Sequence, residues 1–251
     1  MTKKNEETAF NYFEEFGKDA SGFEGINLDT VSIPFIRLLQ NLSPQVKKNK
    51  PEFNPEAEPG MLFNTVSEKL YTPPLKIVVG KFERFYIEWK PNRGPFVAAH
   101  DVALVETEMM PRLARDENYK LYDPKTGNIF MDTYIYYVMM PDAMEEGVCI
   151  ISLSSSGIKE AKKLNRNLIS TMIPGTTKRA MPYFMVWNTH VVEMSNDKGD
   201  WYGLKFQFDS FVTKPQLDYV VKERKALPSK TTDLALLQST TAEESDDEVK
   251  Y

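Results

Sequence analysis

The chain has 251 residues, of which 41% are hydrophobic and 12% aromatic, so it can bury the core of one large domain. It has no uninterrupted apolar run of about 18 residues, which on sequence grounds excludes a membrane-spanning helix. The single cysteine, Cys149, excludes an internal disulfide. With only two histidines, the chain also lacks the ligands of a zinc site of the usual spacing.

The formal net charge of −5 is unevenly distributed along the chain. From residue 226 to the end there are two lysines and six acidic residues, a net charge of −4, which leaves −1 for the rest. We predict a flexible arm over 1–25, one folded domain over 26–225, and a disordered linker with an acidic tail over 226–251. A near-neutral body with an acidic tail is compatible with a basic binding groove.

The folded domain is predicted to begin with a short apolar element at 33–40, a proline-rich loop at 44–60 and a short strand at 61–66. The longest predicted strand follows at 75–97, because this stretch is rich in β-branched and aromatic residues and ends in a Pro-Asn-Arg-Gly turn signal. Alternation predicts a core face made of Ile77, Val79, Phe85, Ile87 and Trp89. The other face combines rings with a guanidinium (Phe82, Arg84 and Tyr86), and Gly80 is where a β-bulge is expected.

The next predicted elements form two hairpins. Residues 96–105 return antiparallel to the long strand, and a polar connection covers 109–118. A second hairpin joins 119–122 to 129–140 through an Asp-Pro-Lys-Thr-Gly-Asn turn. Its second arm carries another aromatic face, with Tyr134 and Tyr136.

A buried strand at 148–153 is predicted to lead into a helix at 157–172, with N-cap oxygens offered by the preceding serines. Six basic residues against one acid, Glu160, make 157–180 the most basic region of the chain. A third hairpin (183–194 and 201–212) and a helix at 215–227 complete the domain. This order of elements favours a mainly β, α+β fold: an OB-fold-like antiparallel barrel with an inserted helix and a C-terminal helix.

Aromatic rings on which bases stack, next to cations that follow phosphates, are typical of surfaces that bind single-stranded nucleic acid. The rings predicted to stack are Phe82, Tyr86, Tyr134, Tyr136 and Trp201. The cations predicted to neutralise phosphates are Arg84, Lys90, Arg93, Lys178, Arg179 and Lys205. On the long strand alone, the simpler interpretation is a half-buried strand with ordinary surface charges.

Several stretches resemble the bacteriophage and prophage proteins regarded as single-stranded DNA-binding proteins: 33–48, 59–70, 78–100, 151–168 and 192–206. The resemblance implies an OB-fold core, sequence-independent binding of single strands in DNA replication or recombination, and a location in the host cytoplasm. It also implies an acidic tail that contacts replication or recombination proteins through Glu243, Glu244, Asp246, Asp247, Glu248 and Tyr251. The tail ends Val-Lys-Tyr, whereas bacterial single-strand binders end Pro-Phe.

Catalysis finds little support in the sequence, which has no phosphate-binding loop, no G-x-S-x-G elbow and no H-E-x-x-H. We therefore expect no enzymatic activity and no cofactor. A metal-dependent nuclease would need clustered carboxylates, and the nearest set is Asp101, Glu106 and Glu108 beside His100. Two non-enzymatic classes also fit the sequence: a virion or scaffold protein, and a protein that binds host replication factors.

Overall fold

The computed structural model describes residues 33–197 and 199–227, apart from the side chains of Arg93 and Ala226. The chain divides into two units, Met1–Ser32 and Ile33–Tyr251, and every described residue belongs to the second. The predicted arm at 1–25 and the predicted acidic tail, from Glu243 to Tyr251, lie outside the described residues.

The long strand β4 (Leu75–Trp89) runs through the centre of the main sheet. It pairs antiparallel with β8 (Ile129–Met139), with β10 (Met185–Asn196) at its first residues and with β5 (Phe96–Asp101) at its last. On the far side of β8 lie β9 (Val148–Ser154) and the short β7 (Leu121–Tyr122) and β6 (Ala114–Arg115). The edge strand β11 (Gly199–Phe211) forms a hairpin with β10. The long strand and the hairpins predicted from sequence are therefore present.

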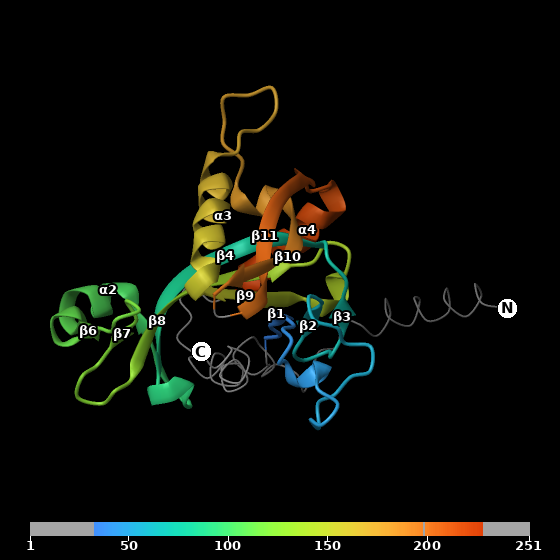
Figure 1. Cartoon of the computed structure of the whole chain (residues 1–251). Coiled ribbons are helices and arrows are strands. Elements are labelled where there is room, and N and C mark those ends of the chain that lie inside the picture. Colours follow the sequence, from blue (N-terminus) through green and yellow to red (C-terminus); the bar gives the residue numbers. More distant parts are fainter. Residues whose placement is uncertain (1–32, 198, 228–251) are drawn as a thin grey trace, which may run out of the picture. The chain divides into compact units, whose positions relative to one another are not determined.

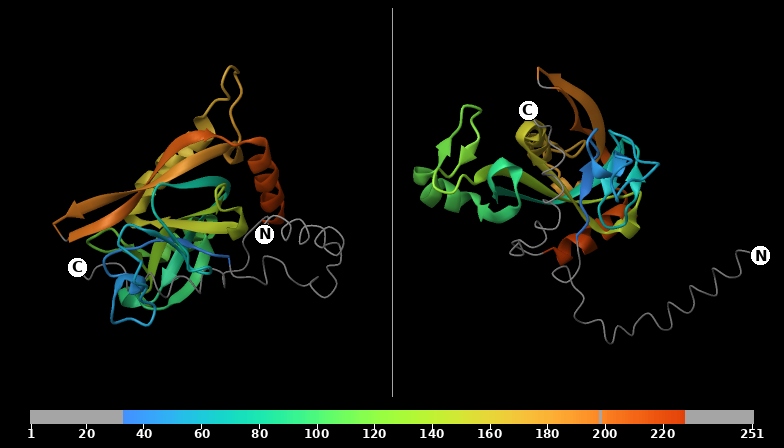
Figure 2. Two further views of the ribbon diagram at one scale, coloured as in Figure 1. Left: turned by 90° about the vertical axis from the view of Figure 1, so that its right-hand side faces the viewer. Right: turned by 60° about the horizontal axis from the view of Figure 1, so that its bottom comes forward.

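The element order of the sheet matches an OB-like fold. Three strands (β4, β8 and β9) are followed by a helix, α3 (Ile158–Ser170), and then by two more strands (β10 and β11), with β4 paired to both β8 and β10. The sheet curls into a half-barrel, as Figures 1 and 2 show. A mainly β, α+β fold of OB-like topology, predicted from sequence, is confirmed.

A small second sheet, made of β1 (Ile36–Leu38), β2 (Leu62–Asn64) and β3 (Leu70–Tyr71), links the two ends of the curled sheet. On one side, Phe35 forms a parallel bridge with Ile150 of β9. On the other, the Gln40 side chain donates to the carbonyl of Tyr202 on β11 (3.0 Å) and accepts from its backbone N–H (2.9 Å). The sheet edges are thus tied together by this segment.

A bulge at Gly80 decides which residues of β4 face the core. The register with β8 shifts between Val79 and Lys81, and a Cβ at Gly80 would lie 2.6 Å from the methyl carbon of Met139. A bulge adds one residue, so all later side chains move to the opposite face. Ile77 and Val79 therefore share their face with Phe82, Arg84 and Tyr86. The predicted grouping of Ile77 and Val79 with Phe85, Ile87 and Trp89 is wrong for this reason.

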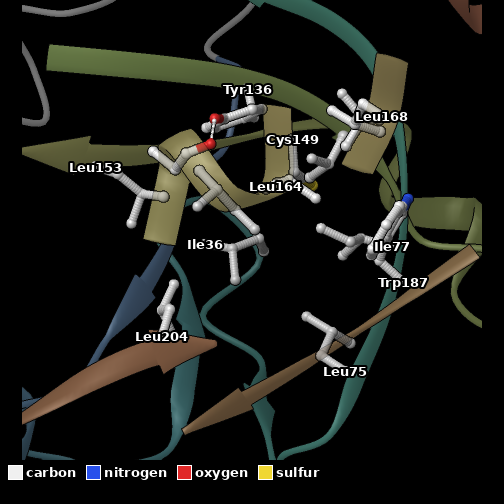
Figure 3. Packing of buried hydrophobic residues seen from close by; sticks show 14 of the residues in the cluster. Ile36, Leu75, Ile77, Tyr136, Cys149, Leu153, Leu164, Leu168, Trp187 and Leu204 are labelled. Atoms are coloured by element: carbon white, nitrogen blue, oxygen red, sulfur yellow. Dashed lines mark hydrogen bonds between the residues drawn. The ribbon is translucent and has the colours of Figure 1, made fainter. Parts of the chain in front are cut away.

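The main core lies between the curled sheet and α3 (Figure 3). Three residues of the helix are fully buried in it, namely Ala161, Leu164 and Leu168. The helix begins after a 3-10 turn (Ser155–Gly157). Its N-cap residue is Gly157, and Ser154, the N-cap residue of the turn, makes no side-chain capping bond, contrary to the serine cap expected from sequence.

A separate lobe connects β4 to β8 and packs on the far end of these strands. It contains a 3-10 turn (Pro91–Arg93), β5, the short helix α2 (Val102–Leu104), a π-helical turn (Val105–Met109), a second 3-10 turn (Met110–Arg112), β6 and β7. Its small core unites Tyr86, Val105, Met109, Leu121 and Phe130. Figures 1 and 2 show the part that carries α2, β6 and β7 projecting from the sheet.

The C-terminal helix α4 (Lys214–Ala226) is fixed to the barrel by polar contacts. The Tyr219 hydroxyl donates to the carbonyl of Gly147 (3.2 Å), and the Arg224 guanidinium donates to the carbonyl of Gly80 (3.0 Å). None of the helices formed by residues 33–197 and 199–227 is both long and apolar enough to cross a membrane.

Candidate nucleic-acid interface

Phe82 is the predicted stacking residue whose ring is most accessible. The Gly80 bulge places it on the core face of β4, and 39% of its surface is exposed. Its ring lies 5.5 Å from that of Tyr134 and 5.1 Å from that of Tyr136, between centroids. The neighbouring rings hold Phe82 in place, so its exposed part can receive a base without a large loss of side-chain entropy.

Tyr134 and Tyr136 are core residues, with 6% and 1% of their surface exposed, which corrects the prediction that they stack with bases. Helix α3 covers Tyr136 (Figure 3). The Tyr136 hydroxyl donates a hydrogen bond shared between Asn165 Oδ1 (2.9 Å) and the carbonyl of Ala161 (3.1 Å). Burial raises the pKa of the Tyr136 hydroxyl, because ionisation would place a charge in the core. Neither ring presents a free face to a ligand.

Tyr86 is also buried, with 7% of its surface exposed, and its predicted role in stacking is corrected in the same way. It lies in the small core of the lobe with Val105 and Met109. Burial raises the pKa of its hydroxyl. The π-helical turn at 105–109 supplies two of the residues that cluster with this ring, and β7 and β8 supply Leu121 and Phe130.

Arg84 lies between the rings of Tyr86 and Tyr134, with its guanidinium carbon 5.7 and 5.6 Å from their centroids. Its guanidinium donates two hydrogen bonds to Asp132, with Nε–Oδ1 and Nη2–Oδ2 distances of 2.7 and 2.9 Å. Glu106 of the lobe lies 3.7 Å from its Nη1. The hydrogen bonds to Asp132 raise the pKa of Arg84 further above its ordinary value. Much of the charge of Arg84 is therefore compensated within the protein.

The most basic stretch of the chain, residues 157–180, lies on α3 and the loop after it. Its six cations are all exposed and we call them the α3 basic surface: Lys159, Lys162, Lys163, Arg166, Lys178 and Arg179. Glu160 is the one acid among them, and it accepts a hydrogen bond from Lys163 (2.6 Å). The loop is a small hairpin, because Met172 pairs with Arg179 and the N–H of Ala180 donates to the carbonyl of Thr171 (2.9 Å). Lys178 and Arg179 are therefore held on an ordered support.

Asn165 connects Phe82 to the α3 basic surface. Its side chain and the ring of Phe82 both contact Tyr136, from α3 and from β4 respectively. Lys162 precedes Asn165 by three residues, so it lies on the same flank of the helix. A ring and a cation are thus placed on neighbouring elements, one on the sheet and one on the helix.

The remaining predicted residues lie on other elements. Lys90 is exposed just after β4, and the side chain of Arg93 is not described. Lys205 (exposed) and Trp201 (half-buried) are on the same face of β11, four residues apart. The structure does not bring these positions together with Phe82.

Sequence reasoning missed Tyr119, which has 80% of its surface exposed. The sequence pattern places it in the first arm of a hairpin, and nothing in that pattern distinguishes an exposed tyrosine from a buried one. Its neighbours, Asp116, Glu117, Asn118 and Lys120, form a strongly polar stretch. That polarity is the one local signal that the ring lies at the surface.

Asp101 and Glu106, two of the carboxylates considered for a nuclease centre, have separate partners. Asp101 accepts a hydrogen bond from the N–H of Ala103 (2.8 Å) at the start of α2, and Glu106 is near Arg84. His100 Nε2 lies 2.7 Å from an oxygen of Glu88, and the other oxygen of Glu88 accepts from Asn128 (2.6 Å). Within residues 33–197 and 199–227 there is no group of three or more His, Cys, Asp or Glu side chains that could hold a metal ion.

The fold and this surface define a protein with an OB-like half-barrel and a basic helix on one side. A family model described as "Pam3 phage gp34-like protein" matches residues 3–231. The chain belongs to this phage protein family. No curated protein and no solved structure matches it. The predicted phage origin is confirmed, and the binding of single-stranded DNA stays a prediction.

Proposed function

We propose that this phage protein is a non-catalytic, sequence-independent single-stranded DNA-binding protein that acts in DNA replication or recombination. The observation that carries the proposal is the α3 basic surface: six exposed cations with one acid among them, on a helix that contacts the same tyrosine as the exposed ring of Phe82. Cations that follow phosphates and a ring that stacks with a base are the two elements of a single-strand site.

Single strands fit this surface better than a duplex. The exposed ring of Phe82 stacks only with a base that is unpaired, and such stacking is worth about 1–3 kcal/mol. The cations contribute a sequence-independent attraction to phosphates, through release of the counterions that surround the nucleic acid. OB-like barrels commonly bind oligonucleotides, which agrees with the fold.

A protein partner on the same surface is the second candidate function, and a specific observation favours it. Three large apolar side chains lie exposed at the end of α3 and in the loop after it: Ile169 (64%), Met172 (44%) and Met181 (54%). Exposed methionines beside cations are typical of surfaces that accept acidic, amphipathic protein segments. Sequence-independent, salt-sensitive binding to oligonucleotides distinguishes the first function from this one.

The test compares two matched pairs of exposed helical residues on α3 and on α4. We expect Lys162→Ala/Arg166→Ala to weaken binding to labelled oligo-dT and oligo-dA alike. The salt dependence, log Kd against log salt, should flatten by about 0.7 for each phosphate that the variant no longer neutralises. The control Lys222→Ala/Lys225→Ala removes the same charge from α4 and should leave both quantities close to wild type. Equal effects of the two pairs would show that only net charge matters and that α3 is not the site.

A further inference from the structure

Tyr119 lies at the tip of the hairpin formed by β6 and β7, in the lobe that connects β4 to β8. Among the large apolar and aromatic side chains that the structure describes as exposed, its 80% is the highest fraction, and Ile169 is next at 64%. A tyrosine ring usually finds at least partial cover in a folded protein. The exposure of this ring therefore needs an explanation.

The turn fixes the backbone that carries the ring by a set of hydrogen bonds around Asp116. One oxygen of the Asp116 carboxylate accepts from the N–H groups of Asn118 (2.9 Å) and Lys120 (2.8 Å). The N–H of Tyr119 donates to the Asp116 carbonyl (3.0 Å), and the N–H of Asp116 donates to the Lys120 carbonyl (3.0 Å). The Arg115 guanidinium donates to the carbonyl of Tyr119 (2.9 Å). Such a turn is preorganised rather than loose.

The backbone of Tyr119 is strained. Its φ of 63° lies in the left-handed region, which a bulky side chain rarely adopts and which glycine adopts at little cost. Strain of this kind persists where the surrounding structure imposes it, and it is concentrated at binding sites. A glycine would relieve the strain, so the presence of tyrosine points to a use for the ring.

The hairpin is anchored by buried residues of the lobe core, which also contains Tyr86 of β4. Leu121 pairs with Phe130 of β8, and both are buried in the small core of the lobe with Tyr86. Tyr86 follows Phe82 by four residues of β4, a separation of about 13 Å along a strand. In OB-like barrels the connection between the first two strands is one of the loops that bind oligonucleotides, and Tyr119 lies on this connection.

Charges around the ring suit a nucleic-acid strand. Arg115 and Lys120 are exposed on either side of it in sequence. Arg112, just before β6, is exposed as well, and its Nε lies 3.9 Å from a carboxylate oxygen of Asp123. Two acids lie beside the ring in sequence: Asp116, whose carboxylate accepts the N–H groups of the turn, and Glu117. A planar ring flanked by cations is the arrangement on which an unpaired base stacks while its phosphates lie beside the cations.

We propose that Tyr119 is a second stacking site, on which a base of single-stranded DNA rests after the strand leaves the α3 basic surface and Phe82. This inference rests on the proposed function. Because the two sites lie at different places along the sheet, a strand must be longer to occupy both than to occupy one. Tyr119 should therefore matter only for strands long enough to span the distance.

The test uses the full chain, labelled oligo-dT of about 4 and about 16 nucleotides, and two variants. Tyr119→Gly removes the ring and relieves the strain, so it should raise the melting temperature and weaken binding of the long strand about tenfold. It should leave binding of the short strand unchanged. Tyr119→Phe keeps both ring and strain and should bind both strands like wild type. A base on the ring should also cross-link: photoactivated iodouracil in the long strand should modify Tyr119.

Each contrary result has a distinct meaning. If wild type binds long strands and Tyr119→Gly binds them equally well, the stacking site is wrong while the proposed function stands. If wild type binds no oligonucleotide at low salt, the proposed function fails and the inference fails with it. An effect of Tyr119→Gly that is equal for both strand lengths would overturn the placement of Tyr119 as a separate, distal site.

Discussion

Arg84 forms a bidentate ion pair with Asp132, with hydrogen bonds of 2.7 and 2.9 Å. Its guanidinium lies between the rings of Tyr86 and Tyr134. The side chains of Arg84 and Asp132 lie on neighbouring strands, and 32% and 23% of their surfaces are exposed. Because the Asp132 carboxylate already occupies two of its N–H donors, the Arg84 guanidinium should bind a phosphate more weakly than a free arginine does. The pair therefore contributes first to the stability of the β4–β8 ribbon.

We expect Arg84→Ala to lower the free energy of unfolding by about 1.5–3 kcal/mol, the usual contribution of hydrogen bonds to a charged group. Arg84→Lys should recover only part of this, because an ammonium group cannot make the parallel pair of bonds. Urea denaturation monitored by fluorescence measures the effect. If Arg84→Ala leaves stability unchanged but weakens DNA binding, Arg84 contacts a phosphate, as predicted from sequence, and the stabilising role is wrong.

Tyr136 provides the second prediction, since its ring is buried beneath α3. Tyr136→Phe loses the hydrogen bond to Asn165 and Ala161 and should destabilise the fold by about 0.5–1.5 kcal/mol. Tyr136→Ala leaves a cavity in the core and should cost about 3–5 kcal/mol. The folded Phe variant should bind oligo-dT like wild type. Weaker binding by a stable Tyr136→Phe would show that the hydroxyl does contact DNA.

The sequence allowed the strands, the hairpins, the helix α3 and the OB-like order of elements to be predicted, because each has a local signature. Alternation also grouped Phe82, Arg84 and Tyr86 on one face, and Tyr134 and Tyr136 on another strand's face. It could not show what covers that face, because docking of α3 and of the lobe depends on contacts between distant parts of the chain. The single extra residue at Gly80 moved the residues after it to the opposite face, so that Phe82, Arg84 and Tyr86 share the face of Ile77 and Val79.

The reactivity of the Cys149 thiol measures whether the core of the barrel opens locally to solvent. Cys149 has no exposed surface, and burial raises the pKa of its thiol to about 12. Because only the thiolate reacts readily, the native protein should not react with a disulfide reagent at about pH 8. Reaction should appear together with global unfolding in urea. Fast reaction of the folded protein would show that β9 opens locally from the barrel.

The acidic tail carries a prediction made from sequence alone, since residues 228–251 lie outside the described structure. We expect the segment Glu243–Tyr251 to compete with DNA for the α3 basic surface, because five acids are tethered to the chain that carries six exposed bases. Deletion of residues 240–251 should raise affinity for oligo-dT at low salt, and the gain should shrink as salt screens the charges. Thermal stability should not change. Unchanged affinity at low salt would leave the tail as a partner-binding or solubilising segment.

The most direct test of the proposed function is fluorescence anisotropy of the wild-type chain with labelled oligo-dT, oligo-dA and a duplex of equal length, between about 50 and 200 mM salt. We predict micromolar or tighter binding of both single strands at low salt, at least about tenfold weaker binding of the duplex, and an affinity that falls steadily as salt rises. Equal affinity for duplex and single strands would contradict stacking as the basis of selection. Absence of binding at the lowest salt would contradict the function itself.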